Sequence, residues 1–380
     1  MRKGVLTWLP IVLGVAFLLF LAYVQRARAI RGENDFVQLY TGAKLAGTPG
    51  LYSRTANLAT VKETLGFTMD SVVYTRPPFY AGFLKPLALL PYRAAYAVFS
   101  LATLASIVWF VARFSKECDS LPFFAAISIP ALAALCGGQD TPFLLLILGV
   151  SMQFTRKGRD FAAGLVLSLC AIKFHLFLFL PILWLLKRRW RILAGSASGA
   201  AILAGFGLLV CGAGSLRDYL NVLRDPWINP NATGMPNLHG MVAALQGPAW
   251  LEITLVAAVG ATFLWMSHRT DDYEFLFAAS LVAGLLTSFH SGIADDIVLL
   301  PALVCVVATC SNPLVRAATA LILTPVPYFL SLAGAPYSAL FPLSLLVLLG
   351  MFCLASAKGL SSASSCRTAW DSSPSRQPAS

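Results

Sequence analysis

The chain has 380 residues, of which 58% are hydrophobic and only 12% are charged, whereas about a quarter of the residues of an ordinary globular domain are charged. Apolar runs recur from residue 5 to residue 357, and a run of about 20 residues can cross the roughly 30 Å of hydrocarbon in a bilayer. These features exclude a soluble fold and predict an all-α, polytopic membrane protein.

The formal net charge is +11, but the basic residues flank short connections between apolar runs, as the positive-inside rule describes for cytoplasmic loops. We therefore expect membrane lipids, and no nucleic acid, as partners of these charges. The clusters expected in the cytoplasm are Arg2-Lys3, Arg113/Lys116, Arg156-Lys157/Arg159, Lys187-Arg188-Arg189/Arg191, Arg269, Arg316 and Lys358.

The basic clusters and apolar runs together predict about twelve transmembrane helices, some of them short or half-helices, with both termini cytoplasmic. The expected helices lie near residues 5–24, 94–113, 121–136, 143–155, 161–173, 175–186, 192–212, 249–267, 274–289, 297–310, 316–333 and 338–357. The first run is interpreted as a transmembrane helix and not as a cleaved signal peptide.

Two long segments, at about 25–93 and 213–248, are expected on the extracytoplasmic side. The Ser-rich end at 361–380 is expected to be a disordered cytoplasmic tail, which leaves residues 1–360 as one transmembrane domain. Segment 160–186 lies between two basic clusters and must cross twice, with halves shorter than a full span. The turn at Lys173-Phe174-His175 is therefore expected below the outer membrane surface, in a protein-lined cavity.

In this topology the polar residues that the helices do not need fall on the outer side. They are Asp35, Gln139, Asp140, Lys173, His175, Asp218, Asp225, Asn237, His239, His290, Asp295 and Asp296. Ionisable groups at membrane depth are costly and usually functional. A transporter would place such groups near the bilayer midplane, so the one-sided set favours an enzyme at the outer surface. A transporter or flippase of an amphiphilic lipid is the alternative, and a non-catalytic membrane scaffold is a third reading.

No motif of a soluble nucleotide-binding or hydrolytic enzyme competes with this reading. The sequence contains no G-x-x-x-x-G-K-[ST], H-E-x-x-H, G-x-S-x-G or G-x-G-x-x-G, so a nucleotide-sugar site is not predicted. The triplet Glu33-Asn34-Asp35 follows the first apolar run. Taken alone, it is equally consistent with a solvated charge pair, a helix N-cap or a site.

The run from Asp35-Phe36 to Leu51-Tyr52, followed by Tyr74-x-x-Pro77-Pro78 and Lys85-Pro86-Leu87, resembles the first outer loop of glycosyltransferase family 87. The remaining resembling segments, in the family's order, are Gly138-Gln139, Arg159 to Ala163-Gly164 with Lys173, Arg189-Trp190, Met235–Gly240, and His290 with Asp296. The resemblance covers roughly residues 5–310. Two positions depart from the family's common pattern: Phe174 stands where proline is usual, and Asp140 where asparagine or valine is usual.

The resemblance implies a GT-C type fold in the plasma membrane and transfer of a sugar, expected to be mannose. The donor it implies is a polyprenyl-phosphate sugar, and the acceptor is a lipid-linked or cell-envelope glycan at the outer face. It also places the family's catalytic aspartate at Asp35, which we expect to act as the general base of an inverting transfer.

The other site residues are expectations of the same kind. His290 is expected to be catalytic, while Lys173 and His175 are expected to bind the donor phosphate, because its developing charge needs fixed cations. Gln139, Asn237, His239 and Asp296 are expected to contact the sugar or the acceptor. No metal or other cofactor is expected.

Overall fold

The computed structural model describes residues 33–69, 72–225 and 232–357, together with single positions between 12 and 31. Within these residues the chain is helical and has no strand. Most of the expected first helix at 5–24, and all of the tail at 361–380, lie outside the described residues.

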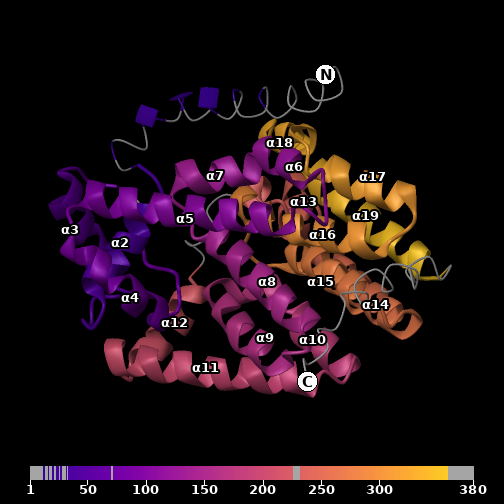
Figure 1. Ribbon diagram of the computed structural model, residues 1–380. Coiled ribbons are helices and arrows are strands. Elements are labelled where there is room, and N and C mark those ends of the chain that lie inside the picture. The colour runs from indigo at the N-terminus through magenta and orange to yellow at the C-terminus, as the bar shows by residue number, and fades with distance from the viewer. Residues whose placement is uncertain are drawn as a thin grey trace, which may run out of the picture.

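The helices follow one another with short connections (Figure 1). The first half contains α2 (Phe36–Leu45), α3 (Arg54–Leu65), α4 (Pro78–Leu84), η1 (Lys85–Leu89), α5 (Tyr92–Phe114), α6 (Leu121–Ala126), α7 (Ile129–Gly137), α8 (Thr141–Arg156), α9 (Asp160–Leu167), η2 (Ser168–Phe177) and α10 (Phe179–Leu186). The second half contains α11 (Trp190–Cys211), α12 (Ser215–Leu223), η4 (Ala232–Gly234), α13 (Leu238–Ala244), α14 (Ala249–Arg269), α15 (Tyr273–Thr287), η5 (Ile293–Val298), α16 (Leu299–Thr309), α17 (Pro313–Ile322), α18 (Pro325–Leu332), η6 (Tyr337–Ala339) and α19 (Leu340–Ala357).

The prediction of a helical membrane protein is confirmed, but the expected number of about twelve transmembrane helices, some of them short, is not confirmed. Five segments in the described part of the chain are long and apolar enough to cross a membrane, or six if one bent pair of helices is counted. The five are Tyr92–Phe114, Asp160–Phe177, Trp190–Cys211, Ala249–Arg269 and Tyr337–Ala357. Most of the other expected helices are present but are shorter than a span or broken in two.

The breaks have local causes. The expected helix at 121–136 is interrupted before α7, where the Ser128 hydroxyl accepts a hydrogen bond from the backbone N–H of Ala131 at 3.1 Å and Pro130 occupies the first turn. A serine cap followed by proline starts a new helix, because proline cannot continue the one before it. Pro325 likewise begins α18, which is bent by 47° from α17.

Segment 160–186 returns to the side from which it starts. The Arg189 guanidinium, just before α11, pairs with the Asp160 carboxylate at the start of α9 at 2.7 Å, so the chain reverses between them. Inside η2 the backbone of Lys173 leaves the helical conformation, with φ −135° and ψ 58°. A kink therefore sits at the lysine where the sequence predicts the turn.

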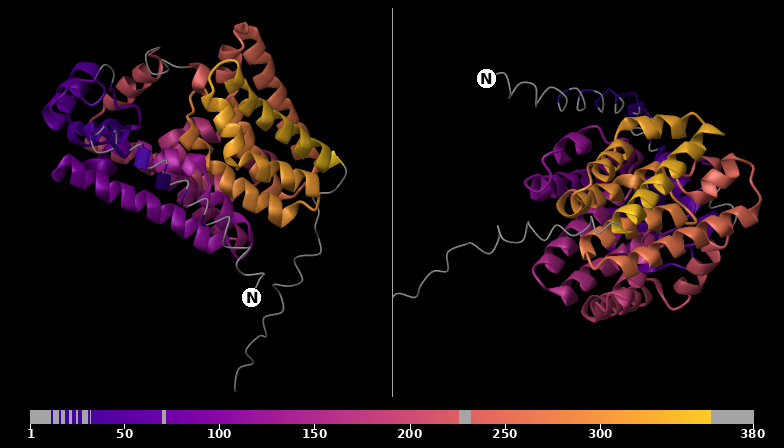
Figure 2. Two further views of the ribbon diagram at one scale, coloured as in Figure 1. Left: turned by 90° about the horizontal axis from the view of Figure 1, so that it is seen from above. Right: turned by 90° about the vertical axis from the view of Figure 1, so that its right-hand side faces the viewer.

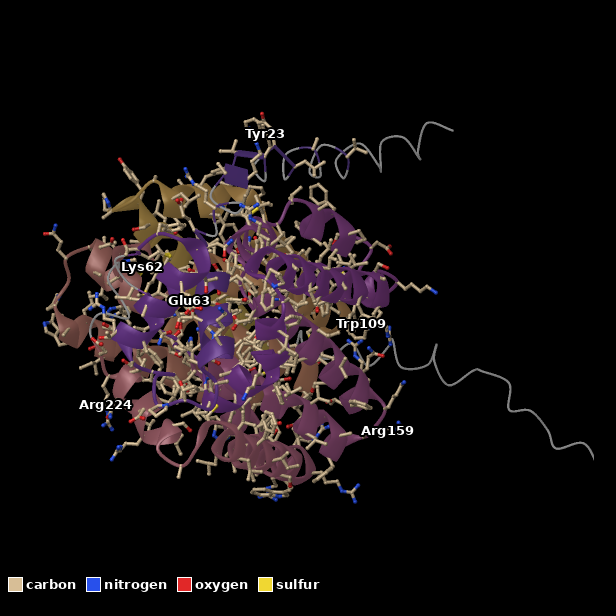
Figure 3. All side chains as sticks on the ribbon, turned by 90° about the vertical axis from the view of Figure 1, so that its left-hand side faces the viewer. Tyr23, Lys62, Glu63, Trp109, Arg159 and Arg224 are labelled. Atoms are coloured by element: carbon tan, nitrogen blue, oxygen red, sulfur yellow. The ribbon has the colours of Figure 1, made fainter. Side chains whose placement is uncertain are left out.

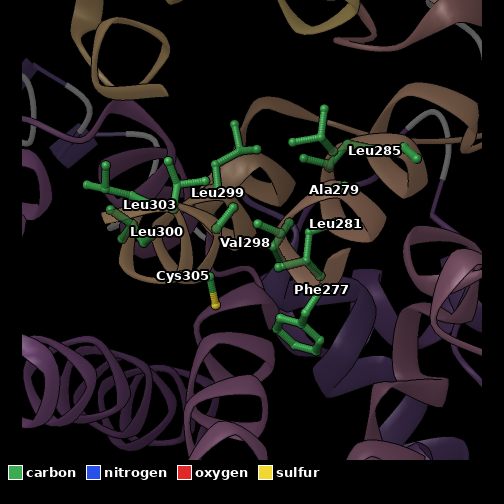
Figure 4. Packing of buried hydrophobic residues seen from close by; sticks show 14 of the residues in the cluster. Phe277, Ala279, Leu281, Leu285, Val298, Leu299, Leu300, Leu303 and Cys305 are labelled. Atoms are coloured by element: carbon green, nitrogen blue, oxygen red, sulfur yellow. The ribbon is translucent and has the colours of Figure 1, made fainter. Parts of the chain in front are cut away.

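Helices α13 to α19 form one side of the molecule, and α2 to α4 with α12 lie at the other (Figures 1 and 2). Helix α15 is central, since every residue from Phe275 to Leu286 is buried, as expected for a helix that is apolar all round. Its residues Phe277, Leu281 and Leu285 lie close to Val298–Cys305 in the main core (Figure 4). A second core joins α2, α4 and the start of α5.

Helices α9 and α11 approach each other closely through glycines. A Cβ atom added at Gly164 would lie 2.0 Å from the carbonyl oxygen of Ile192, and one at Gly195 would lie 2.1 Å from that of Phe161. Only glycine leaves room for this backbone contact, which is a common way to pack helices in membranes. The contact holds α9, which leads into η2 and Lys173, against α11.

Ion pairs tie the basic clusters together at one end of the bundle. Arg156 at the end of α8 bonds to Glu274 at 2.6 Å and also pairs with Glu117, and Lys187 pairs with Asp271 at 2.7 Å. Figure 3 shows Trp109 and Arg159 on the side of the view opposite Lys62 and Arg224, which belong to the two segments expected outside. The clusters around Arg113, Arg156 and Lys187 thus share one end of the fold.

Candidate functional site

A buried charge cluster lies at the opposite end of α8, with Lys173 at its centre. The Lys173 side chain is 4% exposed, and its Nζ atom lies 2.6 Å from Asp295 Oδ1 and 3.6 Å from Asp140 Oδ1. The same ammonium donates to Gln139 Oε1 at 3.3 Å. The kink in η2 therefore places the Lys173 ammonium among the side-chain oxygens of Asp295, Asp140 and Gln139.

Arg76 completes the cluster from the segment that precedes α4. Its Nε and Nη2 atoms donate to the two oxygens of Asp140 at 2.7 and 3.2 Å. Burial by itself would raise the pKa of Asp140, but the charges of Arg76 and Lys173 outweigh it and lower the pKa overall. Two cations and two carboxylates thus balance one another, as buried charges must.

Sequence reasoning did not single out Arg76, and it named Asp140 and Asp295 only among the polar residues expected on the outer side. The only local signal was the departure from the family pattern at Asp140, because an extra buried carboxylate calls for an extra cation. Arg76 supplies that cation from 64 residues away in the sequence. Nothing in the residues around Arg76 indicates this pairing.

Asp35 lies at the open edge of the cluster and contacts it through Gln139. The Gln139 amide nitrogen donates a hydrogen bond to Asp35 Oδ2. The backbones of the two segments are also joined, since the N–H of Asp35 donates to the carbonyl of Gly137 at 2.9 Å. Gly138 has a φ of +64°, and a Cβ there would lie 2.6 Å from Cβ of Phe36, so glycine is needed both for the turn and for the close approach.

Asp35 precedes α2 but does not cap it with its side chain. Instead, Asn34 Oδ1 accepts a hydrogen bond from the backbone N–H of Phe36 at 3.1 Å. The Asp35 carboxylate is therefore not used in capping α2 and bonds to Gln139. The residue is exposed at the surface of the fold, yet protein surrounds it on most sides, and this burial raises the pKa of Asp35. The geometry is that of a carboxylate able to take up a proton from an incoming molecule.

His175 and His290 lie beside the lysine. Their ring centroids are 6.2 Å apart, and the His175 ring is 4.7 Å from that of Phe289. Within the described residues, the buried atoms His175 Nε2 and Ser291 Oγ have no hydrogen-bond partner. Burial lowers the pKa of His290 to about 4, so this ring is expected to be neutral near pH 7.

In the described part of the chain, three of the expected site residues make no hydrogen bond to the charge cluster. Asn237 is fully buried; its Oδ1 caps α13 by accepting from the N–H of Gly240 at 2.8 Å, and its Nδ2 donates to the Ser288 carbonyl at 2.9 Å. His239 Nδ1 lies 3.0 Å from Glu252 Oε2 at the start of α14. Asn237 thus joins the start of α13 to the end of α15, and His239 joins α13 to α14.

The third is Asp296, which is fully buried with no hydrogen-bond partner for either oxygen in the described part of the chain. Its neighbour Asp295 holds the site position instead: one oxygen accepts from Lys173, and the other accepts from the backbone N–H of Gly292 at 2.9 Å. Asp295 therefore belongs to the charge cluster, and the role expected for Asp296 stays a prediction.

A helical membrane protein with an exposed carboxylate beside a buried cluster of paired charges, at the end opposite its basic loops, has the features of a membrane-embedded enzyme. The model of glycosyltransferase family 87 matches residues 74–291, more than half of the 380 residues. The chain belongs to this family, which makes it a membrane glycosyltransferase and confirms the resemblance. No curated protein and no solved structure matches the chain.

Proposed function

We propose that the protein transfers mannose from a polyprenyl-phosphate donor to a lipid-linked or cell-envelope glycan at the outer face of the plasma membrane. The observation that carries the proposal is the position of Asp35. Its exposed carboxylate lies beside a cluster of buried polar groups that can form hydrogen bonds or charge contacts with a phosphate. Family membership supports this enzyme over the transporter and scaffold readings.

In the proposed reaction Asp35 takes the proton of an acceptor hydroxyl while that oxygen attacks the anomeric carbon of the donor sugar. The bond from the anomeric carbon to the phosphate oxygen breaks on the opposite face, so the configuration inverts. Polyprenyl phosphate leaves with the bonding electrons, and its second negative charge must be stabilised by the site.

The donor phosphate is proposed to bind between η2 and the segment that starts at His290. The unpartnered atoms His175 Nε2 and Ser291 Oγ come from these two segments, and neutral His290 can add a hydrogen bond. Lys173 provides the nearest cation, although its ammonium already faces Asp295, Asp140 and Gln139. Its contribution to donor binding is therefore the field of a fixed charge.

The length of α8 supports a lipid-linked donor. Its 16 residues rise about 24 Å at 1.5 Å per residue, less than the roughly 30 Å of bilayer hydrocarbon. With the basic end of α8 at the headgroups, the site at its other end lies below the opposite surface. A phosphate held at headgroup depth by a prenyl chain reaches such a site from the lipid side.

No metal enters the proposal. Among the described residues no group of three or more His, Cys, Asp or Glu is arranged to hold an ion, and the carboxylates of Asp140 and Asp295 are already neutralised by Arg76 and Lys173. We expect transfer by the purified protein to continue in excess EDTA. Loss of activity in EDTA that returns with Mg²⁺ or Mn²⁺ contradicts this part of the proposal.

The donor is tested with the purified protein in lipid nanodiscs, and the acceptor source is a lipid extract from cells lacking the gene, from which polyprenyl phosphate has been removed. Polyprenyl-phosphate mannose should support transfer, and GDP-mannose without polyprenyl phosphate should not. Transfer from GDP-mannose alone would falsify the donor assignment.

A further inference from the structure

One contact is left unexplained by a role for Gln139 in binding the sugar. Its side-chain amide lies between the exposed carboxylate of Asp35 and the buried ammonium of Lys173, and it bonds to both. Lys173 is held in turn by Asp295 and Asp140. A continuous path of hydrogen bonds and ion pairs therefore runs from the buried cluster to the proposed base.

The chemistry of the neighbours fixes which way the amide points. An ammonium has only donors and an ionised carboxylate has only acceptors. The oxygen of Gln139 must therefore face Lys173, and its NH₂ group must face Asp35. Glutamate in this position would oppose one carboxylate to another, so the amide is the group that satisfies both neighbours.

The far end of the path is firmly anchored. The Asp140 carboxylate accepts two hydrogen bonds from Arg76, and Asp295 accepts one from the backbone of Gly292. These ties come from three separate segments, and the four buried charges sum to zero. Lys173 is thus a fixed point from which Gln139 can hold another group in place.

We propose that Gln139 is a positioning residue that holds the Asp35 carboxylate in its catalytic orientation, with Lys173 as its anchor. This inference rests on the proposed role of Asp35 as the general base. The bond from Gln139 occupies Oδ2 of Asp35 and leaves Oδ1 to receive the acceptor's hydroxyl proton. Gln139 keeps its own protons throughout, and its hydrogen bond stabilises the ionised form that a base requires.

The test uses Gln139→Met and Gln139→Glu, assayed with polyprenyl-phosphate mannose and the acceptor-containing lipid extract. Methionine keeps the length of the side chain but removes both hydrogen bonds. We expect kcat to fall about tenfold or more while the donor KM stays unchanged. The acidic limb of the pH profile should move up by about one pH unit, because ionised Asp35 loses a donor.

Gln139→Glu keeps the contact with Lys173, so it still tests the inference if Gln139→Met does not fold. It should also move the acidic limb to higher pH, because a second carboxylate then faces Asp35. The matched control is Gln38→Met, which removes the hydrogen bond from another glutamine of the same region to the carbonyl of Val73. This control should leave the pH profile where it is.

The outcomes separate the inference from the function on which it rests. A raised donor KM with an unshifted pH profile would assign Gln139 to sugar binding and overturn the positioning role. An unshifted profile with a uniform loss of activity would leave it a structural role only, which also overturns the inference. Near-wild-type turnover by Asp35→Asn refutes the base itself, whatever the Gln139 variants do.

Discussion

The buried pair of Arg76 and Asp140 gives the sharpest prediction about the stability of the fold. Arg76 Nε lies 2.7 Å from Asp140 Oδ2, and the side chains of Arg76 and Asp140 are 10% and 0% exposed, respectively. Replacing Asp140 with asparagine keeps the shape but leaves Arg76 and Lys173 with one carboxylate between them. Replacing Arg76 with glutamine leaves two carboxylates with one cation.

The expected magnitude follows from this imbalance. Removing one partner of a buried ion pair costs about 3–5 kcal/mol, because the remaining charge stays buried without compensation. Each single variant should therefore lower the free energy of unfolding by about that amount. The double variant Arg76→Gln/Asp140→Asn restores the charge balance, so its loss should be smaller than the sum of the single losses by about 2–3 kcal/mol.

The assay is reversible unfolding in mixed detergent micelles titrated with sodium dodecyl sulfate, followed by tryptophan fluorescence. Asp271→Asn is the matched control, because its pair with Lys187 has the same 2.7 Å distance while the Asp271 side chain is fully exposed. It should change stability little. Equal losses for Asp140→Asn and Asp271→Asn, or strict additivity in the double variant, would refute the reasoning from burial.

Three further predictions concern orientation and chemistry. In a cysteine-free background, an impermeant thiol reagent should label a cysteine at residue 50 and not one at residue 158 in intact cells; the reverse pattern overturns the outward-facing site. Asp35→Asn should lower kcat by at least roughly 10²-fold while donor binding is retained. Because burial raises the pKa of Asp35, the kcat of the wild-type enzyme should begin to decline, as the pH falls, at a pH above the ordinary aspartate pKa of about 3.9. Lys173→Ala should raise the donor KM more than the acceptor KM; equal effects argue against a role at the donor phosphate.

The sequence by itself determined the class of the protein and most helix positions. Apolar runs bounded by charged residues are a local signal, so the helices expected at 94–113, 192–212 and 249–267 are found as α5, α11 and α14 within a few residues. The order of short motifs was enough to indicate family 87. The same local logic put a turn at Lys173, where the backbone does leave the helix.

Only the tertiary structure decided which polar residues meet. Asp35 and Gln139 are 104 residues apart in the sequence, and Lys173 and Asp295 are 122 apart, and no local pattern encodes such contacts. The choice between Asp295 and Asp296 shows the limit most clearly. Adjacent residues point in different directions, so one position along η5 separates a carboxylate that pairs with Lys173 from one that has no hydrogen-bond partner among the described residues.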